Sequence, residues 1–126
     1  MKASGIRRDE RGATAVEFAL TAPLFFALLF GIVEGGMLMW TQIGIQHGSE
    51  MAARCAGIKK PNCINASDIQ SYAAAQAYGV NPPPATFTVS TAVCGTQVSG
   101  TYKFTFVTTY FGVPTIDLSA QSCFPT

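Results

Sequence analysis

The fold is decided by residues 11–33, which read RGATAVEFALTAPLFFALLFGIV. From Phe18 to Val33 this stretch carries no charged side chain, and Glu17 stands immediately before it. A helix over residues 13–33 would be long enough to span the ~30 Å hydrocarbon core of a bilayer. A carboxylate at the edge of such a span is costly unless something pairs with it. We therefore predict a transmembrane helix and look for the role of Glu17.

Composition excludes several functional classes for the 126-residue chain. Hydrophobic residues make up 48% and charged residues 12%, against ~25% charged in a typical soluble domain. The net charge of +1 gives no indication of a nucleic-acid partner. The few titratable groups assemble no Ser/His/Asp arrangement, phosphate-binding loop or carboxylate pair. We therefore expect no enzyme and no cofactor, and we assign the single histidine, His47, to the surface or to packing.

The predicted helix extends well beyond the membrane span. The apolar pattern resumes after Glu34 and reaches Trp40, an expected marker of the outer interface. Residues 41–56 then become amphipathic, with Ile43 expected against a folded domain and Ser49 expected in water. We predict a polar leader without fixed structure over residues 1–12, followed by the transmembrane helix and its amphipathic extension over residues 13–57. Gly57 is its expected C-cap.

Residues 58–126 predict a small α+β domain. The pattern Ser67-Asp68-Ile69-Gln70 resembles a capping box and predicts a short helix through Tyr78. Alternating residues then predict strands over Ala85–Cys94, Thr101–Phe111 and Thr115–Phe124, with a turn region over residues 95–100. Short connections favour a three-stranded antiparallel sheet, whose apolar face the end of the long helix would cover.

Four cysteines follow the apolar run, and four cysteines allow three pairings. We favour Cys55–Cys63 around a short turn and Cys94–Cys123 between strands. The alternative is a metal site built from Cys55, Cys63 and His47, but no characteristic ligand spacing supports it. Disulfides place the C-terminal domain outside the cytoplasm.

Residues Gly12 and Glu17 distinguish three interpretations of the N-terminus. A cleavable signal peptide does not fit, because the apolar run is too long and lacks a small-x-small site. A plain signal anchor explains the span but not Glu17. Cleavage after Gly12 explains both residues, because the new amine on Ala13 lies one helical turn from Glu17. The carboxylate could pair with this amine or with that of a packed neighbour.

Other polar and small residues leave alternatives open. Glu34 lies either in the headgroup region or within the membrane, where it contacts a partner helix. Gly31 and Gly35, like Gly44 and Gly48, match the small-residue pattern of packed membrane helices.

The residues around Gly12 resemble those of a known family. Gly12, four residues, Glu17 and then Phe18 look like one class of prepilin-peptidase site. The longer pattern through Pro23-Leu24 and Phe30-Gly31-Ile32-Val33-Glu34 closely resembles the start of TadE-like proteins. These are pseudopilins or minor pilins of the tight-adherence (Flp-type) pilus machinery. The resemblance is specific over about the first 55 residues, and the remaining domain shares only a general pilin-like plan.

The resemblance implies cleavage between Gly12 and Ala13 by prepilin peptidase and a role in pilus assembly or secretion. It implies other pilin-like subunits and pilus-assembly membrane proteins as partners, besides the lipid bilayer. We expect a single-pass protein of the bacterial inner membrane with its N-terminus in the cytoplasm and its C-terminal domain in the periplasm. The alternative is an unprocessed single-span anchor that carries an extracytoplasmic binding domain.

Overall fold

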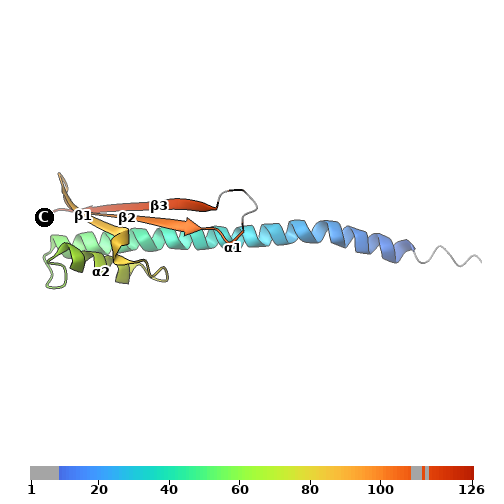
Figure 1. Ribbon diagram of the computed structural model, residues 1–126, viewed down its shortest axis with the longest axis horizontal. Coiled ribbons are helices and arrows are strands. Elements are labelled where there is room, and N and C mark those ends of the chain that lie inside the picture. The colour runs from blue at the N-terminus through green and yellow to red at the C-terminus, as the bar shows by residue number, and fades with distance from the viewer. Residues whose placement is uncertain (1–8, 109–111, 113) are drawn as a thin grey trace, which may run out of the picture. The chain divides into compact units, whose positions relative to one another are not determined.

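The computed structural model describes residues 9–108, 112 and 114–126. The chain divides into two compact units, residues 1–35 and residues 36–126, which we describe separately. Helix α1, Asp9–Gly57, contributes to both units. The second unit also contains α2 (Ala66–Gln76), η2 (Pro84–Thr86), β1 (Phe87–Ala92), β2 (Gly95–Thr105) and β3 (Thr115–Phe124) (Figure 1). The predicted α+β class, with a long N-terminal helix, a short helix and a three-stranded antiparallel sheet, is confirmed.

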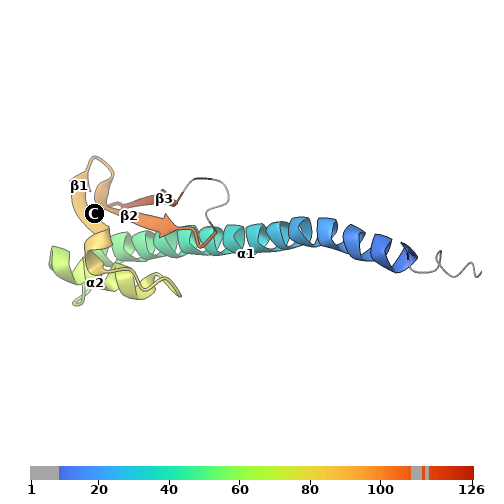
Figure 2. The same ribbon diagram turned by 45° about the vertical axis from the view of Figure 1, so that its right-hand side comes forward.

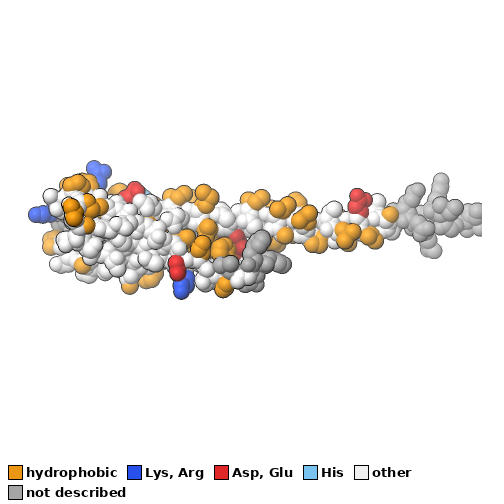
Figure 3. Space-filling model, turned by 90° about the horizontal axis from the view of Figure 1, so that it is seen from above, with side chains coloured by type: hydrophobic (Ala, Val, Ile, Leu, Met, Phe, Trp, Pro, Cys, Tyr) orange, Lys and Arg blue, Asp and Glu red, His pale blue; other side chains and the backbone are white. Residues whose placement is uncertain are grey.

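The first unit consists of an exposed apolar helix. Among the described residues, α1 is the one helix long and apolar enough to cross a membrane, and its most apolar window has no buried residue. Hydrophobic side chains accordingly cover its surface (Figure 3). The helix begins at Asp9, so the prediction that residues 1–12 lack fixed structure is wrong for residues 9–12. Acidic residues suit the first turn of a helix, because they complement its dipole. Residues 1–8 lie outside the described part.

The sheet of the second unit has the order β1-β2-β3, and both pairs are antiparallel. The predicted turn over residues 95–100 is wrong, because β2 begins at Gly95 and pairs with β1 along that whole stretch. Glycine occupies position 100 of this strand because a larger side chain would not fit there. A Cβ atom at Gly100 would approach Ile45 Cγ2 to 2.8 Å and Phe87 Cε1 to 2.9 Å.

Small residues on α1 let the rest of the second unit pack closely against it. A Cβ atom at Gly44 would lie 2.8 Å from Val80 Cγ2, and one at Gly48 would lie 2.6 Å from the carbonyl oxygen of Ala73 in α2. The second small-residue pair of the sequence therefore serves packing within this chain. Ala52 and Ala53 are fully buried beside these glycines.

The core lies where α1, α2 and one face of the sheet meet (Figure 2). Its fully buried side chains include Ile45, Phe87 and Val98. Two expectations for α1 are wrong. Ser49 is completely buried and donates a hydrogen bond to the carbonyl oxygen of Ile45 at 3.0 Å, whereas Ile43 is 63% exposed. Small residues therefore share the buried face of α1 with the hydrophobic Ile45.

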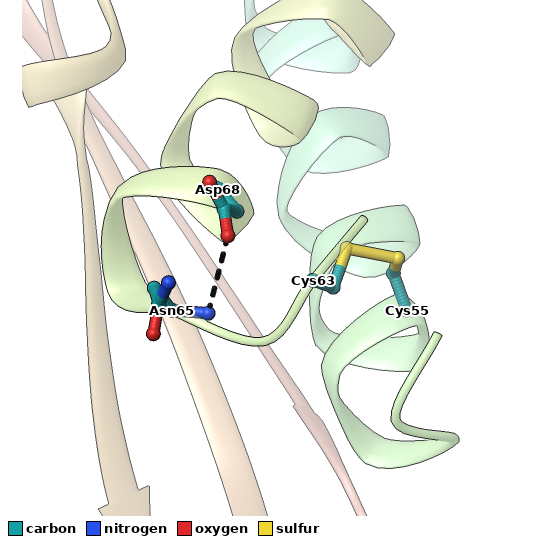
Figure 4. The surroundings of a disulfide bond; sticks show 4 residues. All are labelled: Cys55, Cys63, Asn65 and Asp68. Atoms are coloured by element: carbon teal, nitrogen blue, oxygen red, sulfur yellow. Dashed lines mark hydrogen bonds between the residues drawn. A yellow bond between two sulfur atoms is a disulfide. The ribbon is translucent and has the colours of Figure 1, made fainter. Parts of the chain in front are cut away.

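Two predicted helix caps also differ from the structure. The N-cap of α2 is Asn65, two residues before Ser67, and its backbone N–H donates to Asp68 Oδ2 at 3.4 Å (Figure 4). At the end of α1, the left-handed backbone conformation belongs to Lys59, with φ of 50°. Gly57 instead gives room to the ring of Phe124, which a Cβ atom at Gly57 would strike.

Candidate functional site

The segment from Gly12 to Phe18 forms a continuous exposed helical surface in the first unit. Gly12, Ala13, Glu17 and Phe18 all lie on α1, and all four are exposed. A Cβ atom at Gly12 would meet nothing within 4 Å. The helix therefore does not need glycine at this position for space. Glycine weakens a helix interior by ~1 kcal/mol relative to alanine, so it makes local opening at this point easier.

The carboxylate of Glu17 has no ion pair among the described residues. Residues 13 and 17 are one turn apart on the same helix, a spacing at which side chains are neighbours. The backbone carbonyl oxygen of Glu17 accepts a hydrogen bond from Thr21 Oγ1 at 3.0 Å. Thr21 also donates to the carbonyl oxygen of Phe18 at 3.3 Å. Thr21 itself stands two residues before Pro23, a proline inside the helix. Within the described residues, the Glu17 side chain thus remains available to a further partner.

Glu34 occupies a different position on α1. It is half-buried, whereas Glu17 is exposed. The 17 intervening steps turn a helix by about 100° beyond whole turns, so the two carboxylates lie on different faces. A Cβ atom added at Gly31 or at Gly35 would meet no described atom within 4 Å, which suits close packing against another helix.

Both disulfides join the cysteines that the sequence favours. Cys55 bonds to Cys63, which ties the end of α1 to the loop before α2 (Figure 4). Cys94 bonds to Cys123, which ties the β1–β2 turn to β3. None of the four cysteines is free. His47, the third ligand of the alternative metal site, lies beside Tyr78, with ring centroids 5.3 Å apart and the ring planes tilted by 41°.

Sequence reasoning missed a groove in the second unit. A cavity of about 750 Å³ lies between the end of α1, the start of α2 and strand β1. Its lining includes Lys59, Ile64, Ile69, Val89 and Thr91. The alternation of β1 predicts which side chains face inward, but it does not show that the neighbouring helix leaves the strand edge open.

Comparison with known families bears on the helix that carries these residues. Residues 12–54 match the family model described as TadE-like protein. This segment is TadE-like. The match begins at Gly12 and includes Glu17 and Glu34, and it ends just before Cys55. No curated protein and no solved structure gave a significant match.

The TadE-like match extends over α1 and leaves α2 and the sheet outside. TadE-like proteins are structural components associated with tight-adherence pilus systems, and the family is not known for enzymes. The apolar helix that could span a membrane fits a membrane-anchored component of this kind.

Proposed function

We propose that this chain is a pseudopilin-like component of a Tad/Flp-type pilus assembly or secretion machine. The observation that carries the proposal is Gly12, exposed and sterically free, at the first residue of the TadE-like match. Glu17 and Phe18 follow it at the spacing of a prepilin-peptidase site, directly before the apolar span. In this proposal prepilin peptidase cuts between Gly12 and Ala13 at the bacterial inner membrane.

The disulfides support the proposed orientation. Structural disulfides form and persist in oxidising compartments. Both disulfides belong to the unit of residues 36–126, so in this proposal that unit faces the periplasm and the N-terminus faces the cytoplasm. Once inserted, the apolar helix packs against other pilin-like helices and pilus-assembly membrane proteins. Glu17 pairs there with an N-terminal amine, its own or that of a neighbour, which lowers the cost of holding a charge in the membrane.

Replacing Gly12 with Trp is expected to abolish processing. A Cβ atom at Gly12 meets no described atom within 4 Å, so we expect the effect to arise in the peptidase site. N-terminal mass spectrometry of membrane-extracted protein, with and without prepilin peptidase, measures the result. The wild type with peptidase should begin at Ala13, and Gly12→Trp should keep its leader. Gly31→Trp is the matched control, because Gly31 is another helical glycine without neighbours, and it should be cut normally. An intact leader on the wild type in both samples would instead indicate the unprocessed anchor.

Replacing Glu17 with Gln is expected to leave membrane insertion intact and to weaken assembly. The amide keeps the size of the side chain and removes the charge that would meet the amine. Breaking an ion pair away from water costs more than the ~1.4 kcal/mol that corresponds to a tenfold change. Co-purification with pilin-like partners should therefore fall about tenfold or more. Glu50→Gln, a change at an exposed acid farther along α1, should have no such effect. Equal recovery of partners with both variants would contradict the pairing.

A further inference from the structure

At the outer edge of β1, some backbone N–H and C=O groups point away from the neighbouring strand β2. The N–H of Phe87 donates to the carbonyl oxygen of Pro84, and the carbonyl oxygen of Phe87 accepts from Gln70 Nε2 at 2.8 Å. Both groups of Phe87 are therefore directed away from β2. Pairing alternates along an antiparallel strand, so Val89 and Thr91 direct their N–H and C=O groups outward as well.

The outward groups of Val89 and Thr91 remain open within the part of the chain that the structure describes. No hydrogen bond joins them to another described residue. Because β1 is the first strand in the order β1-β2-β3, no strand of this sheet lies beyond it. The edge thus offers two donors and two acceptors in the spacing of a β-ladder, a template for another strand.

The groove of about 750 Å³ is lined by Val89, Ser90 and Thr91 of this edge strand and reaches Thr96 of β2 and Thr126. Its wall opposite β1 comes from the loop and first turn of α2, including Ile64 and Ala66. Figure 4 shows this turn beside the strands, with the Cys55–Cys63 disulfide holding the loop to α1. Ile69, 6% exposed, contributes an apolar surface, whereas Ile64 is 72% exposed at the rim. An edge strand facing apolar side chains is the arrangement that binds extended peptides by strand addition.

We propose that this groove binds an extended segment of a partner protein, which adds as a strand to β1. Val89 and Thr91 supply the backbone hydrogen bonds, and alternate side chains of the segment enter the apolar part of the groove. Among the described residues that line the groove, Lys59 carries the one charged side chain, so the segment carries an acidic residue facing it. The inference depends neither on cleavage at Gly12 nor on Glu17, and either can fail without the other.

The test uses the full chain in nanodiscs and arrayed nine-residue peptides. Apolar and hydroxyl residues alternate in the peptides, and one position carries Asp, Asn or Lys. We expect binding by peptides with Asp, measured as fluorescence anisotropy of labelled copies. Lys59→Glu should weaken this binding at least tenfold. The peptides that carry Lys in place of Asp should, in turn, bind the Lys59→Glu variant more tightly than they bind the wild-type protein.

Thr91→Pro tests the strand addition itself. Proline removes the outward N–H and leaves every hydrogen bond between β1 and β2 in place. We expect peptide affinity to fall at least tenfold for Thr91→Pro. Thr91→Val, which keeps the N–H, should change it less than threefold. If Thr91→Pro unfolds the unit, amide hydrogen exchange of the wild-type protein tests the strand addition instead. Peptide should slow exchange at Val89 and Thr91 at least tenfold, while Thr88 and Ser90, already paired with β2, change little.

Several results would overturn the proposal. One is the absence of binding below 1 mM for every peptide, on the order of the weakest specific complexes. Others are equal binding by Thr91→Pro and Thr91→Val, or peptide binding without protection of Val89 and Thr91. Concentration-dependent self-association that Thr91→Pro removes would assign the edge to a second copy of this chain, and the proposed partner would be wrong.

Discussion

Gly48→Ala is expected to lower the free energy of unfolding of the unit of residues 36–126 by about 2 kcal/mol, within the range that overpacked cores lose. The new methyl group would lie 2.6 Å from the carbonyl oxygen of Ala73 and 3.2 Å from Phe87 Cζ. A backbone oxygen cannot rotate away as a side chain can, so α2 must move from α1. That movement loosens the contacts of Ala73 and Ala77, both of which are almost completely buried.

Gly36→Ala is the matched control for this prediction. Gly36 is also a glycine of α1 in the same unit, but nothing lies within 4 Å of a Cβ atom there. Both substitutions gain the same helix propensity, ~1 kcal/mol, so their difference isolates the contact with α2. Urea unfolding of the full chain in detergent, followed by the fluorescence of Trp40, gives both values. Equal stability of the two variants would show that α2 does not pack on Gly48.

Replacing both Cys94 and Cys123 with Ala is expected to destabilise the same unit by about 3–4 kcal/mol. The two cysteines are 29 positions apart, and closing a loop of this length contributes about 3.6 kcal/mol in the chain-entropy relation. A loss of this size is a large fraction of the ~5–15 kcal/mol that stabilises a typical domain. Without the bond, the β1–β2 turn is held to the last strand by backbone pairing and side-chain packing.

The control for the disulfide is Gln97→Ala. Gln97 is the cross-strand partner of Cys123, so the substitution changes the same place in the sheet and keeps the bond. A surface substitution of this kind should change stability by no more than ~0.5 kcal/mol. Thermal unfolding under non-reducing conditions compares the two proteins. A loss below about 1 kcal/mol for the double alanine variant would contradict a stabilising role for the disulfide.

The sequence was sufficient to predict the long helix, the order of the elements and the antiparallel sheet. These features depend on strong local patterns: an uncharged run before Glu34 and the alternation of residues such as Tyr102 and Phe104 in β2. Phe104 is 9% exposed, as expected for the inward face of an alternating strand. Local alternation, however, did not identify residues 95–100 as strand, because Gly95 and Gly100 resemble turn residues. The reason for glycine at position 100 becomes clear only from the nearby side chains of Ile45 and Phe87.

The packing face of α1 could be predicted from hydrophobicity only in part, as for the buried Ile45. Ile43 points outward while Gly48 and Ser49 are buried, because α2 needs small residues to approach the helix. The groove beside β1 was missed for a related reason. The groove depends on the distance between the first turn of α2 and Val89. No sequence pattern within either segment indicates that distance.

The two disulfides divide the second unit into two covalently closed halves, and this division determines how the unit responds to a pulling force. The Cys55–Cys63 bond joins α1 to the loop before α2, and the Cys94–Cys123 bond joins the β1–β2 hairpin to β3. No covalent link other than the main chain through residues 77–86 joins these two halves, because both disulfides lie within a half. A pulling force on α1 would therefore act first on the noncovalent contact between helix and sheet. Under tension the unit would yield by shearing along that contact, with each stapled half still intact.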